Sequence, residues 1–217
     1  INIFLNFIEG VFVKVADATI VPEKFRALSL PRFCQKGIKV VRNTPVDPGY
    51  SEPVKKGYVQ IVFAGWLDSG RGIDTLLFLA RNLSGVRIVV AGEGDERIIN
   101  EVKNTPNCEY LGFLNHDEIL KLTKESDFVF AHYSPHRVIN QYAAPNKLAE
   151  SLAVGRPVIV NDETLISKQI LENKCGIVTV YDDPACIKEG IEKLILDVDE
   201  YLDMCLRARE LYETSNR

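Results

Sequence analysis

The stretch Tyr58–Gly72, YVQIVFAGWLDSGRG, decides the fold of this 217-residue chain. It opens with a continuous apolar run rich in β-branched side chains, which is typical of a strand buried on both faces of a sheet. Glycines follow at positions 65, 70 and 72, and a helix is predicted directly after them. That helix is indicated by apolar residues at helical spacing, namely Ile73, Leu76, Leu77 and Ala80.

The same alternation of strand and helix continues towards the C-terminus. Further strands are predicted at 86–91, 108–111, 128–132, 158–160 and 176–180. Helices are predicted between and after them, at about 115–125, 145–155, 164–173, 187–195 and 200–214. Strands that are apolar throughout lie in parallel sheets with helices on both faces. We therefore predict an α/β, Rossmann-like, doubly wound and mostly parallel sheet of about six strands.

The first fifty residues do not follow this alternation. Residues 1–16 contain part of the helix-like FIEGVFVKVAD, SLPRFCQKG looks like a loop, and Val40-Val41 belongs to another short strand. The chain begins with Ile and its only methionine is Met204. We therefore expect residues 1–16 to be the tail of a preceding N-terminal domain. Residues 17–198 would then form the main domain, and 199–217 a C-terminal helix.

Composition argues against several classes of function. The net charge is −4 and no stretch is rich in Lys and Arg, so nucleic acid is an unexpected partner. The opening INIFLNFI is too short to cross a bilayer and lacks the flanks of a secretory signal. The five cysteines are scattered without C-x-x-C spacing, which predicts reduced thiols rather than disulfides or a zinc site.

Ligands of an open parallel sheet bind where strand ends lead into helix N-termini. The loop 65–72 fits this place, because its glycines allow close approach and Arg71 adds donors for phosphate oxygens. A plain turn with a surface arginine is the alternative interpretation. The second such loop, Gly92-Glu93-Gly94, lacks the third glycine of a dinucleotide fingerprint, so a nicotinamide or flavin cofactor is not predicted.

The third loop, YAAPNKLAE at 142–150, carries the strongest signal. On a helix starting near Pro145, Lys147 and Glu150 are neighbours on one face. A solvent-facing ion pair is one interpretation. The other is that Lys147 lies in the first turn, where a cation opposes the helix dipole and therefore favours an arriving anion.

Together these segments resemble the group 1 glycosyltransferases, a retaining family of the GT-B fold. The resemblance covers roughly residues 17–197, and its parts occur in family order: VFAGWLDSGRGID, VRIVVAGEG, CEYLGFLNHDEILKL, SDFVFAHYSP, PNKLAESLAVGRPVIVND and ENKCGIVTVYDD. It implies the C-terminal, donor-binding domain of an enzyme that moves a hexosyl sugar from a nucleoside-diphosphate sugar to an acceptor hydroxyl.

The resemblance also implies roles for individual residues. Glu150 would accept hydrogen bonds from both ribose hydroxyls, while Arg71 and Lys147 would hold the diphosphate; these are the expected catalytic residues. The expected donor-binding residues form the floor, the base contact and the helix start, namely Gly65, Gly92, Phe113, Leu114, Pro145 and Asn146. No cofactor is implied, and none of the six quoted segments contains a D-x-D cluster, so a metal-independent reaction is predicted.

Two positions depart from the family pattern. Tyr142 stands where many members have a first glutamate, and Trp66 stands where many have an arginine. The first departure leaves the donor sugar unassigned. The second leaves diphosphate binding to Arg71 and Lys147.

The implied partners are a nucleoside-diphosphate sugar and a sugar or lipid-linked acceptor, which the preceding domain would hold. A cytoplasmic location is expected, with peripheral association of the full-length protein at the inner face of the membrane. The fragment alone is expected to bind nucleotide without transferring sugar. Two alternatives stay open: a GT-B-fold epimerase or phosphorylase, and a non-catalytic nucleotide-binding module or interaction module whose active site has decayed. His116 is expected on the surface, and His132 at a strand end beside the cleft.

Overall fold

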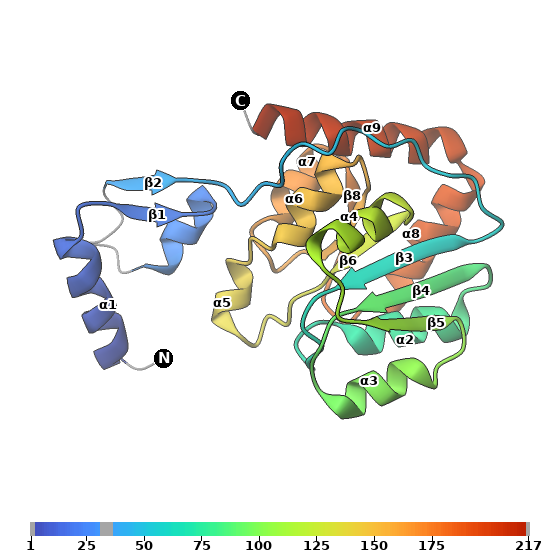
Figure 1. The fold of residues 1–217 in the computed structure, drawn as a ribbon, viewed down its shortest axis with the longest axis horizontal. Helices are drawn as coiled ribbons and strands as arrows, with labels where there is room; N and C mark the ends of the chain where they lie inside the picture. The colour runs from blue at the N-terminus through green and yellow to red at the C-terminus, as the bar shows by residue number, and fades with distance from the viewer. Residues whose placement is uncertain (1–2, 31–36, 216–217) are drawn as a thin grey trace.

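A six-stranded sheet forms the centre of the molecule (Figure 1). The structure, a computed structural model, describes residues 3–30 and 37–215. The strands lie in the order β5-β4-β3-β6-β7-β8, and every neighbouring pair is parallel. This is the strand order of a Rossmann fold, so the predicted doubly wound sheet is confirmed. The strands are β3 (Val59–Ala64), β4 (Val86–Ala91), β5 (Cys108–Gly112), β6 (Phe128–Ala131), β7 (Val158–Asn161) and β8 (Gly176–Thr179).

Helices cover both faces of this sheet. Residues of β3 alternate between the two hydrophobic cores, with Ile61 and Phe63 in one and Val62 in the other, because successive side chains of a strand point to opposite faces. The first core is completed by α2 (Ile73–Asn82), α3 (Glu96–Lys103) and α8 (Pro184–Leu196). The second is completed by α4 (His116–Lys124), α6 (Asn146–Ala153) and α7 (Ser167–Glu172).

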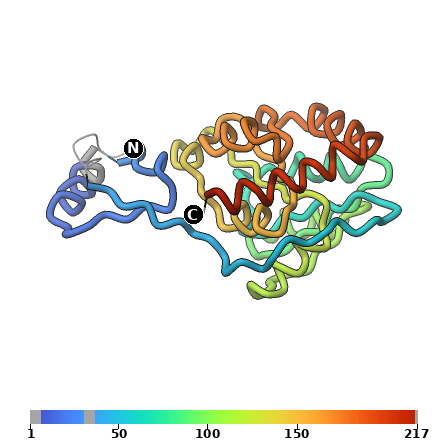
Figure 2. The backbone as a smooth tube through the Cα atoms, turned by 90° about the horizontal axis from the view of Figure 1, so that it is seen from above, coloured from blue at the N-terminus to red at the C-terminus, as the bar shows by residue number. Residues whose placement is uncertain are grey.

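The C-terminal helix α9 (Val198–Ser215) packs against both α6 and α8. A linker between β2 and β3 runs beside it, as both views show (Figures 1 and 2). Arg209 of α9 holds this linker through an ion pair of 2.7 Å with Asp47. Tyr212 donates a hydrogen bond to the carbonyl of Pro45. The linker is therefore fixed to the main body by polar contacts.

Helix α4 begins where the sequence predicts it. The Asn115 side chain accepts from the Glu118 amide at 3.0 Å, and the Glu118 carboxylate accepts from the Asn115 amide at 2.8 Å. This capping box satisfies two amide groups that the helix itself leaves unpaired. The helices α3 and α5 (Val138–Gln141) were not predicted, and α5 lies within the stretch expected to be a polar loop.

A small N-terminal unit stands beside the main body (Figures 1 and 2). It consists of α1 (Ile3–Val15), β1 (Thr19–Val21), the 3₁₀ helix η1 (Lys24–Ser29) and β2 (Ile38–Val40). The helix expected near its start is confirmed as α1. The strands β1 and β2 pair with each other in parallel. Most of the predicted loop SLPRFCQKG, with Cys34, lies outside the described residues.

Two further sequence expectations concern cysteines and membranes. The four cysteines within the described ranges are free thiols: Cys108, Cys175, Cys186 and Cys205. In the part of the chain that the structure covers, no helix combines the length and the apolar character needed to cross a bilayer.

Candidate functional site

The predicted site residues gather where the carboxyl ends of β3, β4 and β5 meet the start of α6. A pocket of about 420 Å³ is lined by eight of them: Gly65, Gly92, Phe113, Leu114, Pro145, Asn146, Lys147 and Glu150. Arg71 lines an adjoining pocket of about 580 Å³. The two pockets share Gly65, Trp66, Pro145 and Lys147. The structure therefore brings all nine predicted residues to one crevice, at the point where the strand order reverses.

Glycines form the floor of this crevice because two backbones touch there. A Cβ atom on Gly92 would lie 1.9 Å from the carbonyl oxygen of Gly65, and one on Gly94 would lie 2.1 Å from that of Leu67. Both glycines have positive φ, +135° and +157°. The Leu67 amide donates to the Glu93 carbonyl at 2.8 Å. The floor is thus closely packed backbone that admits no side chain at these positions.

The ammonium group of Lys147 lies against aromatic rings. Its Nζ is 4.0 Å from the centroid of the Phe63 ring and 5.7 Å from that of Tyr133. Within the described residues, no carboxylate lies within 4 Å of it. The solvent-facing ion pair with Glu150 is therefore not formed, and that interpretation was wrong.

Burial lowers the pKa of Lys147 to about 7, and the positive charge of Arg71 lowers it further in the same direction, against the opposing effect of Glu150. A desolvated cation with a second cation nearby is destabilised in its charged form. An anion entering the pocket would reverse this effect.

Arg71 also lies against the Tyr133 ring. Its guanidinium carbon is 4.8 Å from the Tyr133 ring centroid, so one ring contacts both cations. Its nearest carboxylate is that of Asp68, at 3.9 Å. Asp68 is already engaged, because it accepts a hydrogen bond from the Gly70 amide at 2.7 Å and pairs with Arg137 at 3.4 Å. Most of the donor capacity of Arg71 is thus available to a ligand.

The start of α6 faces the same pocket. Pro145 is the residue before the first turn, and no described side chain caps that turn. Uncapped amide groups and the helix dipole attract an anion. Asn146, the first residue of the helix, lines the pocket together with Lys147.

Glu150 is the only acidic residue of α6, and its side chain is turned inward. The residue is 8% exposed, and its Oε1 lies 3.4 Å from Nδ1 of His116. Burial raises the pKa of the Glu150 carboxyl, while His116 and then Lys147 act in the opposite direction. His116 has the predicted exposure, with 59% of its side chain accessible. Its contact with Glu150 was not predicted.

His132 does not reach the pocket. It is fully buried and stacks on Phe130 with 4.5 Å between ring centroids. Neither ring nitrogen has a hydrogen-bond partner among the described residues. Burial lowers its pKa to about 4, so the ring is neutral. His132 is not among the residues that line either pocket of the crevice.

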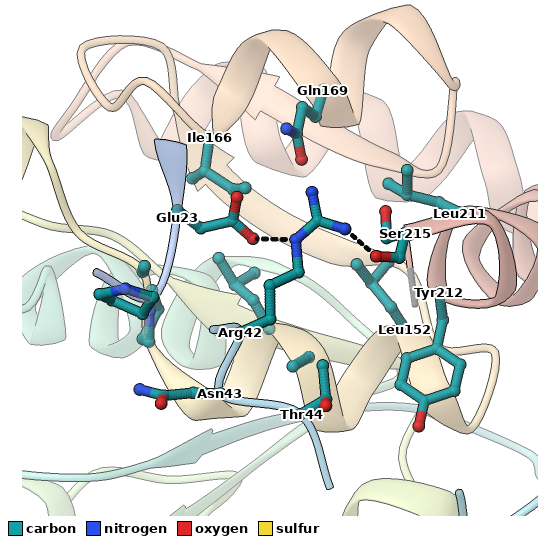
Figure 3. A pocket seen from close by; sticks show the side chains of 15 residues that line it. Glu23, Arg42, Asn43, Thr44, Leu152, Ile166, Gln169, Leu211, Tyr212 and Ser215 are labelled. Atoms are coloured by element: carbon teal, nitrogen blue, oxygen red, sulfur yellow. Dashed lines mark hydrogen bonds and ion pairs between the residues drawn. The ribbon is translucent and has the colours of Figure 1, made fainter. Parts of the chain in front are cut away.

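A separate cavity of about 60 Å³ lies on the other side of α6 (Figure 3). Arg42 enters it, pairs with Glu23 at 3.1 Å and donates to the carbonyl of Ser215. Its walls are largely apolar, with Leu152 and Leu211 among them. Because this space holds only a few water-sized groups, it is too small for a nucleotide. It links the N-terminal unit to the end of α9.

A family model described as Glycosyl transferases group 1 matches residues 51–211. The chain belongs to this family. Among curated proteins, it is similar to the Uncharacterized glycosyltransferase MJ1607 of Methanocaldococcus jannaschii, with 27% identity over 149 residues. That alignment covers 63% of this chain and 36% of MJ1607.

Solved glycosyltransferase structures share the fold of this group 1 member. Anabaena Alr3699/HepE superposes with a TM-score of 0.74 at 14% identity, covering 97% of this chain and 62% of that one. Sucrose-phosphate synthase from Thermosynechococcus elongatus gives 0.72 at 16% identity, with 96% and 56% covered. The C-terminal domain of LpcC from Francisella tularensis gives 0.61 at 16%, with 80% and 99% covered.

The chain thus spans about a third of the curated relative and little more than half of two of these structures. The near-complete coverage of the LpcC C-terminal domain fits the predicted place in a GT-B fold. Across the described ranges, no three His, Cys, Asp or Glu side chains are arranged to hold a metal ion. Metal independence of the reaction stays a prediction.

Proposed function

We propose that this chain is the donor-binding half of a retaining glycosyltransferase that transfers a hexosyl group from a nucleoside-diphosphate sugar. The observation that carries the proposal is the pair of cations at one aromatic ring. Lys147 and Arg71 both contact Tyr133, and no described carboxylate neutralises Lys147. They stand beside the uncapped start of α6. A diphosphate matches this arrangement in charge and size.

The adjoining pocket supports the rest of the donor assignment. Glu150 would accept hydrogen bonds from the two ribose hydroxyls, and the segment Phe113–Leu114 would contact the base. As the bond between C1 and the phosphate oxygen breaks, negative charge grows on the departing diphosphate. Lys147, Arg71 and the first amides of α6 would stabilise that charge without a metal. The Alr3699/HepE structure contains UDP and glucose, which supports a donor of this class.

The N-terminal unit fits a place at the edge of an acceptor-binding half. Parallel strands are normally covered on both faces, yet Ile20 of β1 and Val40 of β2 are exposed. The aromatic side chains Phe7 and Phe12 of α1 are exposed as well. We therefore extend the proposed N-terminal half from residues 1–16 to about residue 42. A sugar or lipid-linked acceptor would bind there, in a cytoplasmic protein that associates peripherally with the membrane.

A thermal-shift panel of UDP, GDP, ADP and their sugars tests the donor assignment. At 100 times its Kd, a bound ligand stabilises the fold by about 2.7 kcal/mol. Glu150→Gln should remove this response, because a neutral amide cannot replace the charged acceptor. Glu172→Gln, at an exposed carboxylate at the end of α7, is the matched control and should respond like the wild type.

Two outcomes would contradict the assignment. A full response of Glu150→Gln would show that the ribose does not bind at this carboxylate. No response of the wild type to any nucleotide would favour an interaction module whose active site has decayed.

A further inference from the structure

His116 and Glu150 form a contact between two helices at the rim of the donor pocket. His116 is the first residue of α4, and Glu150 lies in the middle of α6. Their closest atoms, Nδ1 and Oε1, are 3.4 Å apart. Within the described chain, no hydrogen bond to the Glu150 carboxylate is present, so His116 is its nearest polar partner.

Opposing electrostatic effects act on the pKa of the Glu150 carboxyl. Burial favours its neutral form and raises its pKa. Two groups oppose this, the imidazole of His116 from α4 when it is protonated and, more weakly, Lys147 from α6. Lys147 is itself destabilised as a cation by burial and by Arg71. The imidazole is therefore the main group that keeps the carboxyl ionised.

We propose that His116 is a positioning residue that keeps the Glu150 carboxylate charged and oriented for the two hydroxyls of a nucleotide ribose. This inference rests on the proposed function. An ionised carboxylate accepts hydrogen bonds at both oxygens, whereas a protonated one also presents a donor. Two hydroxyl donors therefore need the ionised form. The capping box of Asn115 and Glu118 fixes the start of α4, and with it the place of His116.

This role gives a pH signature. Histidine as a residue type changes its charge between pH 5 and 8, and burial raises the pKa of the Glu150 carboxyl towards that range. Without His116, protonation of Glu150 would begin at a higher pH. Loss of the imidazole should therefore weaken ribose binding at low pH and leave binding at high pH almost unchanged.

The test uses UDP-glucose, GDP-mannose and ADP-glucose, whose phosphates do not titrate in this range. The Kd of the sugar nucleotide that binds best is measured by calorimetry from pH 6 to 8.5. His116→Gln should bind like the wild type at pH 8.5 and about twofold to fivefold more weakly at pH 6. His116→Arg carries a cation at every pH and should restore binding at pH 6. Asp117→Asn, an exposed neighbour on α4, is the control and should match the wild type throughout.

The ratio of variant to wild-type Kd cancels the titration of Lys147, because both proteins contain it. A ratio that stays constant across the pH range, or a failure of His116→Arg to restore binding, would overturn the proposal.

A ligand-free measurement separates this inference from the proposed function. The pKa of Glu150 is followed by carbon-13 NMR of labelled glutamate side chains. His116→Gln should raise it, and an unchanged value refutes the role of His116 even if nucleotides bind. If no sugar nucleotide binds the wild type, the proposed function fails, whatever the NMR result, and the ribose role fails with it.

Discussion

Two cations flank helix α6 from opposite ends, and their surroundings differ completely. Arg156 lies just beyond the last turn and is 0% exposed. Its guanidinium donates to backbone carbonyls on all sides, including those of Ser126 at 2.8 Å, Lys124 at 2.6 Å and Glu52 at 3.2 Å. Lys124 ends α4, so Arg156 lies at the negative ends of two helix dipoles.

Lys147 lies in the first turn of the same helix, at the positive end of its dipole. It contacts aromatic rings and, within the described residues, has no carboxylate within 4 Å. Burial disfavours the charged form of Lys147 and lowers its pKa. For Arg156, hydrogen bonds to carbonyls compensate the cost of burial. The difference teaches that a cation whose donors are satisfied stabilises the fold. A cation whose donors are free is suited to a ligand.

The largest expected effect is on stability, at Arg156. Arg156→Met should lower the free energy of unfolding by about 3–5 kcal/mol, because several buried carbonyls lose their donor at once. Urea denaturation measures it. Lys147→Met in the same assay should be as stable as the wild type or more so. Equal destabilisation by both changes would remove the distinction between the two cations.

The second effect is on nucleotide affinity. Lys147→Met should weaken binding of a sugar nucleotide by about tenfold to a hundredfold, as expected for loss of a hydrogen bond to a charged group. Titration calorimetry on the folded variant measures the change. Tight binding by this variant would show that the diphosphate lies elsewhere.

The third effect is the uptake of a proton by Lys147 when a diphosphate binds. With a pKa near 7 in the folded chain against an ordinary 10.5, Lys147 is mostly neutral at pH 8. A bound diphosphate favours its charged form, so binding at pH 8 should take up about one proton per site. Calorimetry in two buffers of different ionisation enthalpy measures this uptake, which Lys147→Met should abolish.

The lowered pKa of Lys147 also makes the stability of the fold depend on pH. Between pH 7 and about 10 the unfolded chain binds the extra proton, so this group makes the free energy of unfolding rise with pH. A wild type and a Lys147→Met variant with parallel stability profiles over this range would contradict the shift.

The smallest effect is the electrostatic coupling of Lys147 and Arg71. Arg71→Gln removes one positive charge near Lys147 and should therefore raise the pKa of Lys147 by a fraction of a unit. Nitrogen-15 NMR of the lysine side chain follows this titration. A lowered pKa would mean that the two groups do not face each other as described.

Most of the fold followed from the sequence because its strands are short apolar runs, and β3, β4 and β5 also end at glycines. Helix α3 was not predicted, although Asp95 caps it and accepts from the Arg97 amide at 2.8 Å. Helix α5 has four residues, too few for a periodic pattern. The pairing of β1 with β2 joins residues separated by η1 and a loop, and no local pattern encodes it.

The sequence predicted those site residues that lie in the loops after strands and at the helix starts that these loops lead into. All nine predicted residues line one crevice, but the aromatic partners of the cations were not foreseen. Tyr133 lies two residues after the end of β6, a position that could have indicated it, whereas Phe63 lies inside a strand that reads as ordinary core. The contacts of His116 and Arg156 depend on how separate helices approach, which a single sequence does not show.

The glycine floor has a consequence for protein engineering. Side chains cannot be introduced at Gly92 without displacing the backbone of Gly65, so this part of the crevice offers no freedom for redesign. At Gly112 the space is open, but its φ of +71° favours glycine, whereas the next residue, Phe113, is 74% exposed. Under the proposed donor assignment, variation of Phe113 and Leu114 would alter the choice of nucleobase while the glycine floor stays unchanged, which makes these two positions the target for a library of altered donor preference.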